Sequence, residues 1–212
     1  MLVVNEIFHS IQGESTHAGR PCVFVRLTYC NLWCSYCDTE YAFEEGNEMS
    51  VEEIIKKINS YNCKLVEITG GEPLLQPAVH HLMTLLCDSG YEVLLETSGS
   101  MDISVVDPRV KRIIDFKCPS SGMEMRNFWD NVYYLKDDDE VKFVIGDKND
   151  YEWAKGIIKK YDLLKKTVVL MGVVAGVLEP KKLAEWILND HLNVRYQLQI
   201  HKYIWSPDTR GV

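Results

Sequence analysis

The chain is organised around one stretch, Val23-Phe24-Val25-Arg26-Leu27-Thr28-Tyr29-Cys30-Asn31-Leu32-Trp33-Cys34-Ser35-Tyr36-Cys37. Its first part is apolar and β-branched, which is typical of a buried strand. Its second part places three cysteines in the spacing C-x3-C-x2-C. A short loop that leaves a strand can bend three thiolates around one centre, as an iron–sulfur cluster requires. Because a four-iron cluster has one iron more than three cysteines can bind, that iron stays open to a small molecule.

The same three cysteines have a second interpretation. Closely spaced cysteines in an intracellular protein often bind zinc. A closed zinc site takes four ligands, and Cys22 or His17 could be the fourth. The cysteines by themselves leave both kinds of metal centre open.

Composition limits the class of protein. The 212 residues suit one domain, residues 1–212, with a substantial core. A net charge of −8 argues against a nucleic-acid surface, which needs clustered Lys and Arg. No apolar run approaches the roughly 20 residues that span a bilayer, so we expect no membrane contact. The seven cysteines, and a start at Met1–Glu6 that lacks a basic export signal, predict a cytoplasmic protein.

Strands and helices alternate along the chain. We expect six short apolar strands, at 23–28, 65–69, 93–96, 112–116, 141–145 and 167–171. Helices are expected between them, one opened by the capping box Ser50-Val51-Glu52-Glu53 and others at 77–87, 125–134, 151–161 and 181–190. This α/β alternation predicts a parallel sheet in a partial (β/α)6 TIM-like barrel, with short extensions at both ends.

In such a barrel the chemistry lies at the carboxyl ends of the strands. We therefore expect one rim to carry the loops at 30–37, 70–72, 96–99 and 117–122, and Gly172 just after the sixth strand. The acidic run Asp137-Asp138-Asp139-Glu140 reads as a solvated turn. The segment 4–15 combines a short apolar strand with a polar turn, and indicates an edge strand.

Two motifs in order carry a resemblance. The cysteine triplet resembles the cluster motif of the radical S-adenosylmethionine (radical SAM) superfamily, and Thr69-Gly70-Gly71-Glu72-Pro73 resembles its GGEP segment. Glycines that follow a strand let the backbone approach the amino and carboxylate groups of SAM closely. The resemblance implies the radical SAM type of partial barrel.

The ends of the chain narrow the resemblance. Several further segments are similar to the 7-carboxy-7-deazaguanine synthase family. They are the turn Ile11-Gln12-Gly13-Glu14, the Cys-Asp-Thr at the last cysteine, the segment 117–122, and the closing segments 201–205 and 210–212. The resemblance runs from about Glu6 to Val212. Ser15 departs from it, because glycine is expected after Gln-Gly-Glu, and Cys118 stands where the family varies.

That family converts 6-carboxy-5,6,7,8-tetrahydropterin to 7-carboxy-7-deazaguanine with loss of ammonia, toward queuosine and other 7-deazapurines. The resemblance implies a radical SAM lyase with a [4Fe–4S] cluster, SAM and Mg²⁺. Cluster and SAM would carry the radical chemistry, with SAM regenerated, and the protein would position them and exclude water.

The resemblance assigns each candidate residue a role. Cys30, Cys34 and Cys37 would hold the cluster, and Thr39 would offer Mg²⁺ a hydroxyl oxygen together with the substrate. The substrate would contact Ile11, Gln12, Gly13, Glu14, Arg26, Thr69, His201 and Lys202. SAM would contact Gly70, Gly71, Glu72, Ser98, Lys117, Pro119 and Ser120. Independently of the resemblance, a charged Arg26 inside an apolar strand needs an anionic partner. The resemblance implies that the substrate carboxylate is this partner.

The resemblance also implies a homodimer and an electron donor such as flavodoxin or ferredoxin. The alternative is a glycyl-radical-enzyme activase, which shares the cysteine loop and the small size. Such an enzyme acts on a protein backbone and would need neither the turn at 12–14 nor Mg²⁺ at Thr39.

Overall fold

The computed structural model describes residues 1–206 and 209–212. The strands are β1 (Leu2–Ile11), β2 (Pro21–Leu27), β3 (Asn47–Met49), β4 (Leu65–Gly70), β5 (Glu92–Thr97), β6 (Lys111–Asp115), β7 (Glu140–Ile145), β8 (Val168–Val173) and β9 (Arg195–Tyr196). The α-helices are α1 (Val51–Asn59), α2 (Ala78–Asp88), α3 (Lys148–Tyr161), α4 (Pro180–Asn189) and α5 (His201–Ile204). No helix among the described residues is long and apolar enough to cross a membrane.

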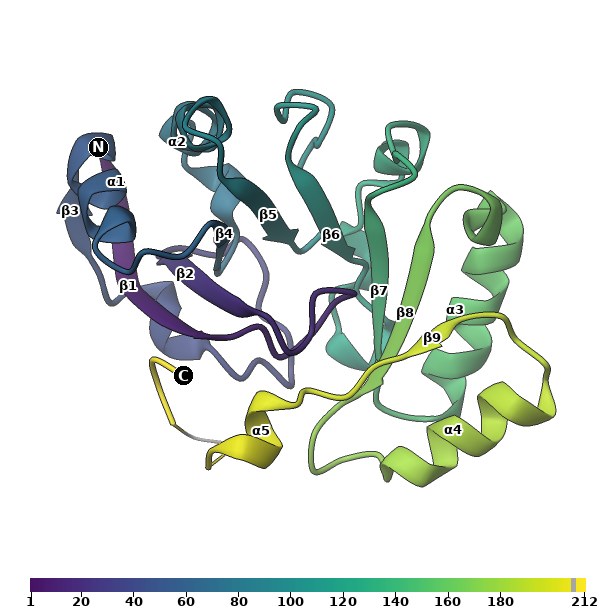
Figure 1. Ribbon diagram of the computed structural model, residues 1–212. Helices are drawn as coiled ribbons and strands as arrows, with labels where there is room; N and C mark the ends of the chain where they lie inside the picture. Colours follow the sequence, from purple (N-terminus) through teal and green to yellow (C-terminus); the bar gives the residue numbers. More distant parts are fainter. Residues whose placement is uncertain (207–208) are drawn as a thin grey trace.

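All nine strands form one sheet in the order β3-β1-β2-β4-β5-β6-β7-β8-β9. From β2 onward the neighbouring strands are parallel. The sheet curves into an open arc with α1, α2 and α3 on its outer side, and the C-terminal segment runs along the open side (Figure 1). The six expected strands correspond to β2 and β4 to β8, so the partial barrel is confirmed.

Strand register decides which side chains reach the interior of the arc. Side chains alternate between the two faces of a strand. On β2, Val23, Val25 and Leu27 belong to the main core beneath the helices. The alternating residues Phe24 and Arg26 line the cavity inside the arc. A shift of one residue would bury the charge in the helix layer and move the apolar side chains into the cavity.

The expected capping box is present. Ser50 Oγ accepts a hydrogen bond from Glu53 N at 3.2 Å, and Glu53 Oε2 accepts one from Ser50 N at 2.7 Å. These bonds satisfy backbone donors that the first turn of a helix leaves unpaired. The helix then buries Ile54 and Ile58 against the sheet.

The helix expected at 125–134 is absent. The structure has two short 3₁₀ turns instead, Glu124–Arg126 and Trp129–Tyr133. Asn127 next to the first turn exchanges two hydrogen bonds with the backbone of Lys117, at 2.9 and 3.0 Å. Such side-chain-to-backbone bonds compete with regular helix bonds.

Two of the four residues in the acidic run are not solvated, contrary to expectation. Asp139 is fully buried and accepts hydrogen bonds from Arg112 N at 3.0 Å and Arg112 Nε at 3.1 Å. Glu140 is 3% exposed and accepts a hydrogen bond from Thr16 N at 3.0 Å. Both carboxylates have partners distant in sequence, which charge patterning along the chain does not reveal.

The expected edge strand is confirmed only in part. β3 pairs with the outer side of β1 from Leu2 to Val4, whereas from Glu6 to Ile11 the pairing strand among the described residues is β2 alone. One further expectation was wrong. Gly172 lies inside β8, which continues to Val173, and the loop that follows reaches the cavity with Val174 and Ala175.

Candidate active site

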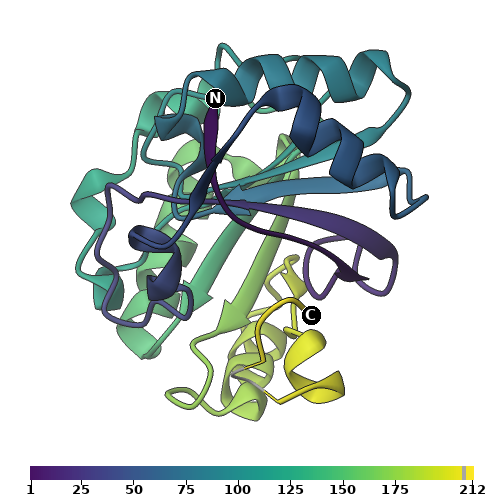
Figure 2. The ribbon, with the colours of Figure 1, turned by 90° about the vertical axis from the view of Figure 1, so that its left-hand side faces the viewer.

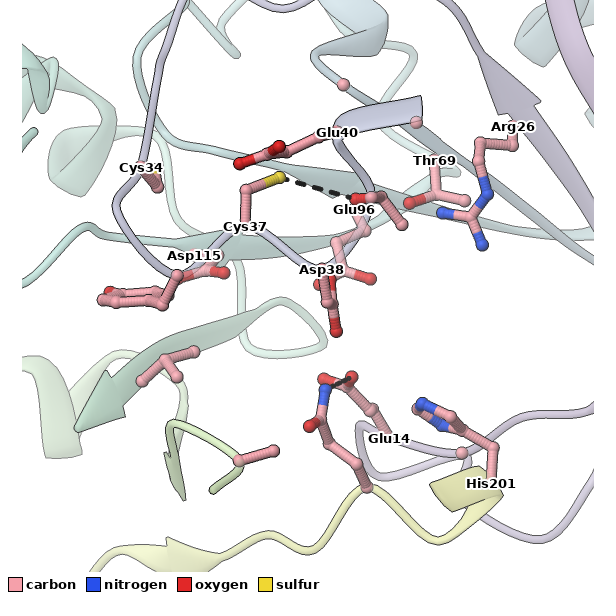
Figure 3. A pocket seen from close by; sticks show the side chains of 18 of the residues that line it. Glu14, Arg26, Cys34, Cys37, Asp38, Glu40, Thr69, Glu96, Asp115 and His201 are labelled. Carbon is pink, nitrogen blue, oxygen red and sulfur yellow. Dashed lines mark hydrogen bonds between the residues drawn. The ribbon is translucent and has the colours of Figure 1, made fainter. Parts of the chain in front are cut away.

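A cavity of about 950 Å³ lies inside the arc. Its wall combines the inner face of the sheet, the loop after β2, the turn after β1 and the C-terminal segment (Figure 3). Sixteen expected site residues line it: Ile11, Gln12, Gly13, Glu14, Arg26, Cys30, Cys34, Cys37, Thr39, Thr69, Gly70, Gly71, Ser98, Lys117, His201 and Lys202. Glu72, Pro119 and Ser120 do not line it.

The loop after β2 brings Cys30, Cys34 and Cys37 to this wall. Cys37 N donates a hydrogen bond to Cys34 O at 3.2 Å, and Leu32 N donates one to Cys30 Sγ at 3.4 Å. All three cysteines are half-buried and unbridged. Burial raises the pKa of Cys30, and raises that of Cys34 to about 11. In the protein alone Cys30 and Cys34 are therefore thiols, and a bound metal centre would have to ionise them.

Gly70 and Gly71 pack against the start of the cysteine loop. Gly71 N donates to Leu27 O at 3.2 Å, and Glu72 N donates to Tyr29 O at 2.8 Å. A Cβ atom at Gly71 would lie 2.2 Å from the Tyr29 carbonyl oxygen and 2.8 Å from Cys30 Cβ. Only residues without a side chain allow this approach. The two glycines thus let the loop after β4 pack directly on the cysteine loop, and both line the cavity with the three thiols. This arrangement fits an iron–sulfur cluster with an adjacent ligand.

Glu72 supports the wall from behind. It is fully buried. Its carboxylate accepts hydrogen bonds from Leu74 N at 3.0 Å, Thr97 Oγ1 at 2.8 Å and Ser98 N at 2.8 Å. In this structure Glu72 therefore ties the loop after β4 to the loop after β5, and its side chain is not directed to the cavity.

The segment with Pro119 and Ser120 likewise lies behind the cysteine loop. Ser120 N donates to Asp150 Oδ1 on α3 at 2.9 Å, and Ser35 Oγ donates to Ser120 O at 2.7 Å. Ser35 lies between Cys34 and Cys37. The segment thus holds the loop that presents the cysteines.

The two side chains considered as a fourth zinc ligand have other neighbours. His17 Nε2 pairs instead with Glu92 at 3.1 Å, and Cys22 is buried with Phe8 and Phe24. This arrangement disfavours the closed zinc site, which needs four ligands around one ion.

Thr39 precedes the 3₁₀ turn Glu40–Phe43 but makes no side-chain capping bond to it. Its hydroxyl lies 3.8 Å from Cys37 Sγ and lines the cavity. The hydroxyl oxygen is therefore available as a hard ligand beside the cysteines.

Arg26 reaches the cavity from β2 beside Thr69 of β4 (Figure 3). Arg26 Nε donates to Glu6 Oε1 at 2.8 Å, and Tyr41 OH donates to the same oxygen at 3.1 Å. Within the described residues, the two Nη groups of Arg26 donate to no protein acceptor. Glu6 therefore already provides a carboxylate for the Nε side of Arg26. The expected substrate carboxylate could pair only with the Nη end of the guanidinium.

The C-terminal segment closes the cavity opposite the cysteines. Ile200 N donates to Gly13 O at 3.0 Å, and the ring of His201 packs so closely on Gly13 that a Cβ there would lie 2.0 Å from His201 Nδ1. Lys202 Nζ reaches Asp38 in the cysteine loop at 2.8 Å. Figure 2 shows α5 beside the turn that joins β1 and β2.

Comparison with known proteins agrees with this geometry. Residues 25–185 match the Radical SAM superfamily. A 7-carboxy-7-deazaguanine synthase of Chlorobaculum tepidum is 49% identical over all of this chain and 97% of its own length. One of Koribacter versatilis is 43% identical over 99% of each chain. This chain belongs to the 7-carboxy-7-deazaguanine synthase family of radical SAM enzymes. The crystal structure of QueE from Escherichia coli, 21% identical, shares the fold with a TM-score of 0.72 over 92% of each chain.

As a radical SAM enzyme of this synthase family, the chain is implied to use a [4Fe–4S] cluster and SAM. Its departure at Ser15 has a structural consequence. Ser15 adopts φ +61°, the left-handed region that favours glycine. Ser15 N donates to Gln197 Oε1 at 2.8 Å, and Ser15 Oγ accepts from His17 N at 3.0 Å. These bonds hold the turn in the conformation that glycine would adopt without strain.

Several charged residues of the synthase cavity were missed by sequence reasoning. They are Glu67 on β4, Asp115 on β6 and Lys142 on β7, together with the uncharged Gln199 of the C-terminal segment. Glu96 on β5 was expected on this rim but was given no role. Each of the four charges interrupts or ends an apolar strand, which is the same signal that singled out Arg26. Applied to every strand, that signal would have found them.

Gln12 differs from a simple substrate contact. Its Oε1 accepts a hydrogen bond from Glu14 N at 2.9 Å, and its Nε2 donates to Glu67. Its backbone pairs with Arg20 and Gly19, both at 2.8 Å. The side chain therefore shapes the turn of the synthase that presents Glu14.

Proposed function

We propose that this protein converts 6-carboxy-5,6,7,8-tetrahydropterin to 7-carboxy-7-deazaguanine and ammonia by ring contraction, with a [4Fe–4S] cluster, SAM and Mg²⁺. The observation that carries the proposal is that a single cavity is lined by the three cysteines, by Arg26 and by Glu14. Its volume of about 950 Å³ is at the upper end of the range for small-molecule sites, as a site for both a cofactor and a substrate requires.

The residues of the chain have distinct tasks in this proposal. Cys30, Cys34 and Cys37 would hold the cluster, and the backbone of Gly70 and Gly71 would accept SAM beside it. When bound, the cluster and SAM supply the one-electron chemistry that starts the reaction. The protein itself binds, orients and encloses the substrate.

Charge complementarity orients the pterin. The free Nη end of Arg26 suits the substrate carboxylate, because guanidinium and carboxylate form two parallel hydrogen bonds. Glu14, on the opposite side of the cavity, suits the N–H groups of the pyrimidine edge (Figure 3). A flat substrate with a carboxylate at one end and N–H donors at the other could pair with Arg26 and Glu14 at the same time.

Thr39 would bind Mg²⁺ with oxygens of the substrate and water. One hydroxyl is a weak ligand, so the ion would enter with the substrate carboxylate. A homodimer, a flavodoxin or ferredoxin as electron donor, a cytoplasmic location, and the use of the product for queuosine or another 7-deazapurine stay predictions.

The test is an anaerobic assay of reconstituted protein with SAM, dithionite and Mg²⁺, with and without the pterin, followed by mass spectrometry. Substrate-dependent formation of 7-carboxy-7-deazaguanine is expected. SAM cleavage without this product would leave the radical SAM chemistry intact and refute the substrate. The absence of both cluster and SAM cleavage would refute the cofactor assignment as well.

A further inference from the structure

Lys142 is a buried cation that the proposed roles above do not use. It lies in the middle of β7, its side chain is 6% exposed, and it lines the cavity. Three carboxylates surround its ammonium group, each from a different element. Lys142 Nζ lies 2.9 Å from Glu14 Oε2 and 3.6 Å from Asp115 Oδ2, and it also pairs with Glu96.

These contacts occupy the ammonium group. It has three N–H donors, of which two are donated to Glu14 and Glu96 while the third faces Asp115. Lys142 is therefore poorly placed to bind a substrate directly. Its effect on the substrate must pass through a carboxylate that it holds.

Of the three carboxylates around Lys142, Glu14 accepts the most hydrogen bonds from other side chains of the described residues. Besides Lys142, its carboxylate accepts hydrogen bonds from Gln197 Nε2 and Gln199 Nε2, both at 2.8 Å. Its backbone N–H donates to Gln12. Three contacts thus fix the position and the orientation of this carboxylate, and the bond to Gln12 fixes the backbone that carries it.

We propose that Lys142 is a positioning residue that acts through Glu14, keeping its carboxylate ionised and directed at the N–H groups of the substrate. The inference rests on the proposed function, because it takes Glu14 as the group that recognises the pyrimidine edge. It adds a determinant of substrate specificity that lies behind the substrate contacts.

Two other glutamates in the same cavity show what distinguishes Glu14. Burial raises the pKa of Glu67 well above its ordinary value, and the charges of Glu96 and Glu14 raise it further. Burial also acts to raise the pKa of Glu14, but Lys142 and then Gln199 hold it at about 2. Glu67 is 2% exposed and the Glu14 side chain 17%, and of these two Glu14 has the direct contact with the lysine. Glu96 also contacts Lys142, yet burial raises its pKa, so Lys142 acts on Glu14 together with the hydrogen bonds from Gln197 and Gln199.

The groups that face Glu14 from each neighbouring element determine its pH dependence. They are Lys142 on β7, Gln197, Gln199 and His201 of the C-terminal segment, Glu96 on β5 and Glu67 on β4. With Lys142 the depressed pKa keeps Glu14 charged at every working pH. Without Lys142, burial and the neighbouring carboxylates would move this pKa upward, and protonation would follow as the pH falls.

The test compares the reconstituted holoenzyme carrying Lys142→Met, Lys142→Arg or a control substitution. The control is Lys111→Met, because Lys111 Nζ pairs with Glu92 at 2.7 Å outside the cavity. The dissociation constant of the pterin and the separate KM and kcat values are measured between about pH 6 and pH 8. Lys142→Met is expected to weaken pterin binding about 10- to 100-fold, more strongly at the acidic end.

Lys142→Arg keeps the charge, so its pterin affinity should stay independent of pH. Lys111→Met should match the wild type. In the Glu14→Gln background Lys142→Met should add little, because two changes that act through one group are not additive. If Lys142→Met does not fold, Lys142→Gln takes its place in the same cycle.

Unchanged affinity of folded Lys142→Met overturns the inference. A second result would also overturn it: Lys142→Met weakens pterin binding fully in the Glu14→Gln background but has no effect in the Glu96→Gln background. Lys142 would then act through Glu96. SAM binding and iron content separate the two proposals. If the wild type binds SAM but neither binds nor converts the pterin, the proposed function fails first; if it converts the pterin, only the role of Lys142 is at stake.

Discussion

Replacing Arg26 with alanine tests the recognition of the substrate carboxylate. The side chain is 16% exposed, and its Nε is held by Glu6 at 2.8 Å. The Nη groups are left for a ligand in the cavity. Arg26→Ala removes this end of the guanidinium without touching Cys30, Cys34 or Cys37, so cluster assembly should be unaffected.

The magnitude follows from the bonds that are lost. Two charge-assisted hydrogen bonds to a carboxylate contribute about 2 to 4 kcal/mol to binding, which is roughly 30- to 900-fold in the dissociation constant. Arg26→Lys keeps the charge but loses the planar pair of donors, so it should recover only part of the affinity. Loss of the Glu6 ion pair adds a small cost in stability, because Glu6 is 20% exposed and water can replace its partner.

The assay is calorimetric titration of the anaerobic, SAM-loaded enzyme with 6-carboxytetrahydropterin, alongside iron content. Glu6→Gln is the matched control: its side chain can still accept from Arg26 Nε, so affinity should change little. Unchanged pterin affinity in Arg26→Ala would refute the carboxylate role. A loss of iron in the same variant would show that the residue supports the cluster loop instead.

Three further predictions concern the cluster, the fold and acid stability. Cys34→Ala should lose the brown colour and the iron of the reconstituted protein; full iron content would contradict its role as a ligand. Asp139→Asn should destabilise the protein by about 3 to 5 kcal/mol, because it leaves Arg112 buried without an anion; a shift in denaturant midpoint worth less than about 1 kcal/mol would disagree. Arg20, with Lys111 and His17, lowers the pKa of Glu92 to about 2 against burial. A carboxyl whose pKa is depressed on folding stabilises the protein above its ordinary pKa of 4.5 and loses this contribution as the pH falls toward 2. The melting-temperature difference between wild type and Glu92→Gln should therefore shrink over this range, and a constant difference would contradict the linkage.

Prediction from sequence worked where the signal was local. The short apolar strands, the Ser50 capping box and the cysteine triplet each depend on a few neighbouring residues, and each was found in the structure. The segment at 125–134 was misjudged because its asparagines bond the backbone of distant residues. Asp139 and Glu140 were misjudged because their partners, Arg112 and Thr16, are far away in sequence.

The candidate site divides in the same way. The cysteine loop and the paired glycines carry their spacing in the sequence, so both could be placed on one rim. Glu72 belongs to the same motif, yet its side chain turns back to the loop after β5. No local pattern distinguishes a carboxylate that faces a cavity from one that braces its wall.

The sequence by itself determined the parallel barrel, the cysteine triplet and the paired glycines beside it, because these depend on periodicity and spacing along the chain. Only the tertiary structure decided that Lys142 holds Glu14. The physical reason is burial. A charge inside an apolar strand must find an opposite charge, and curvature and register of the sheet determine which distant residue provides it.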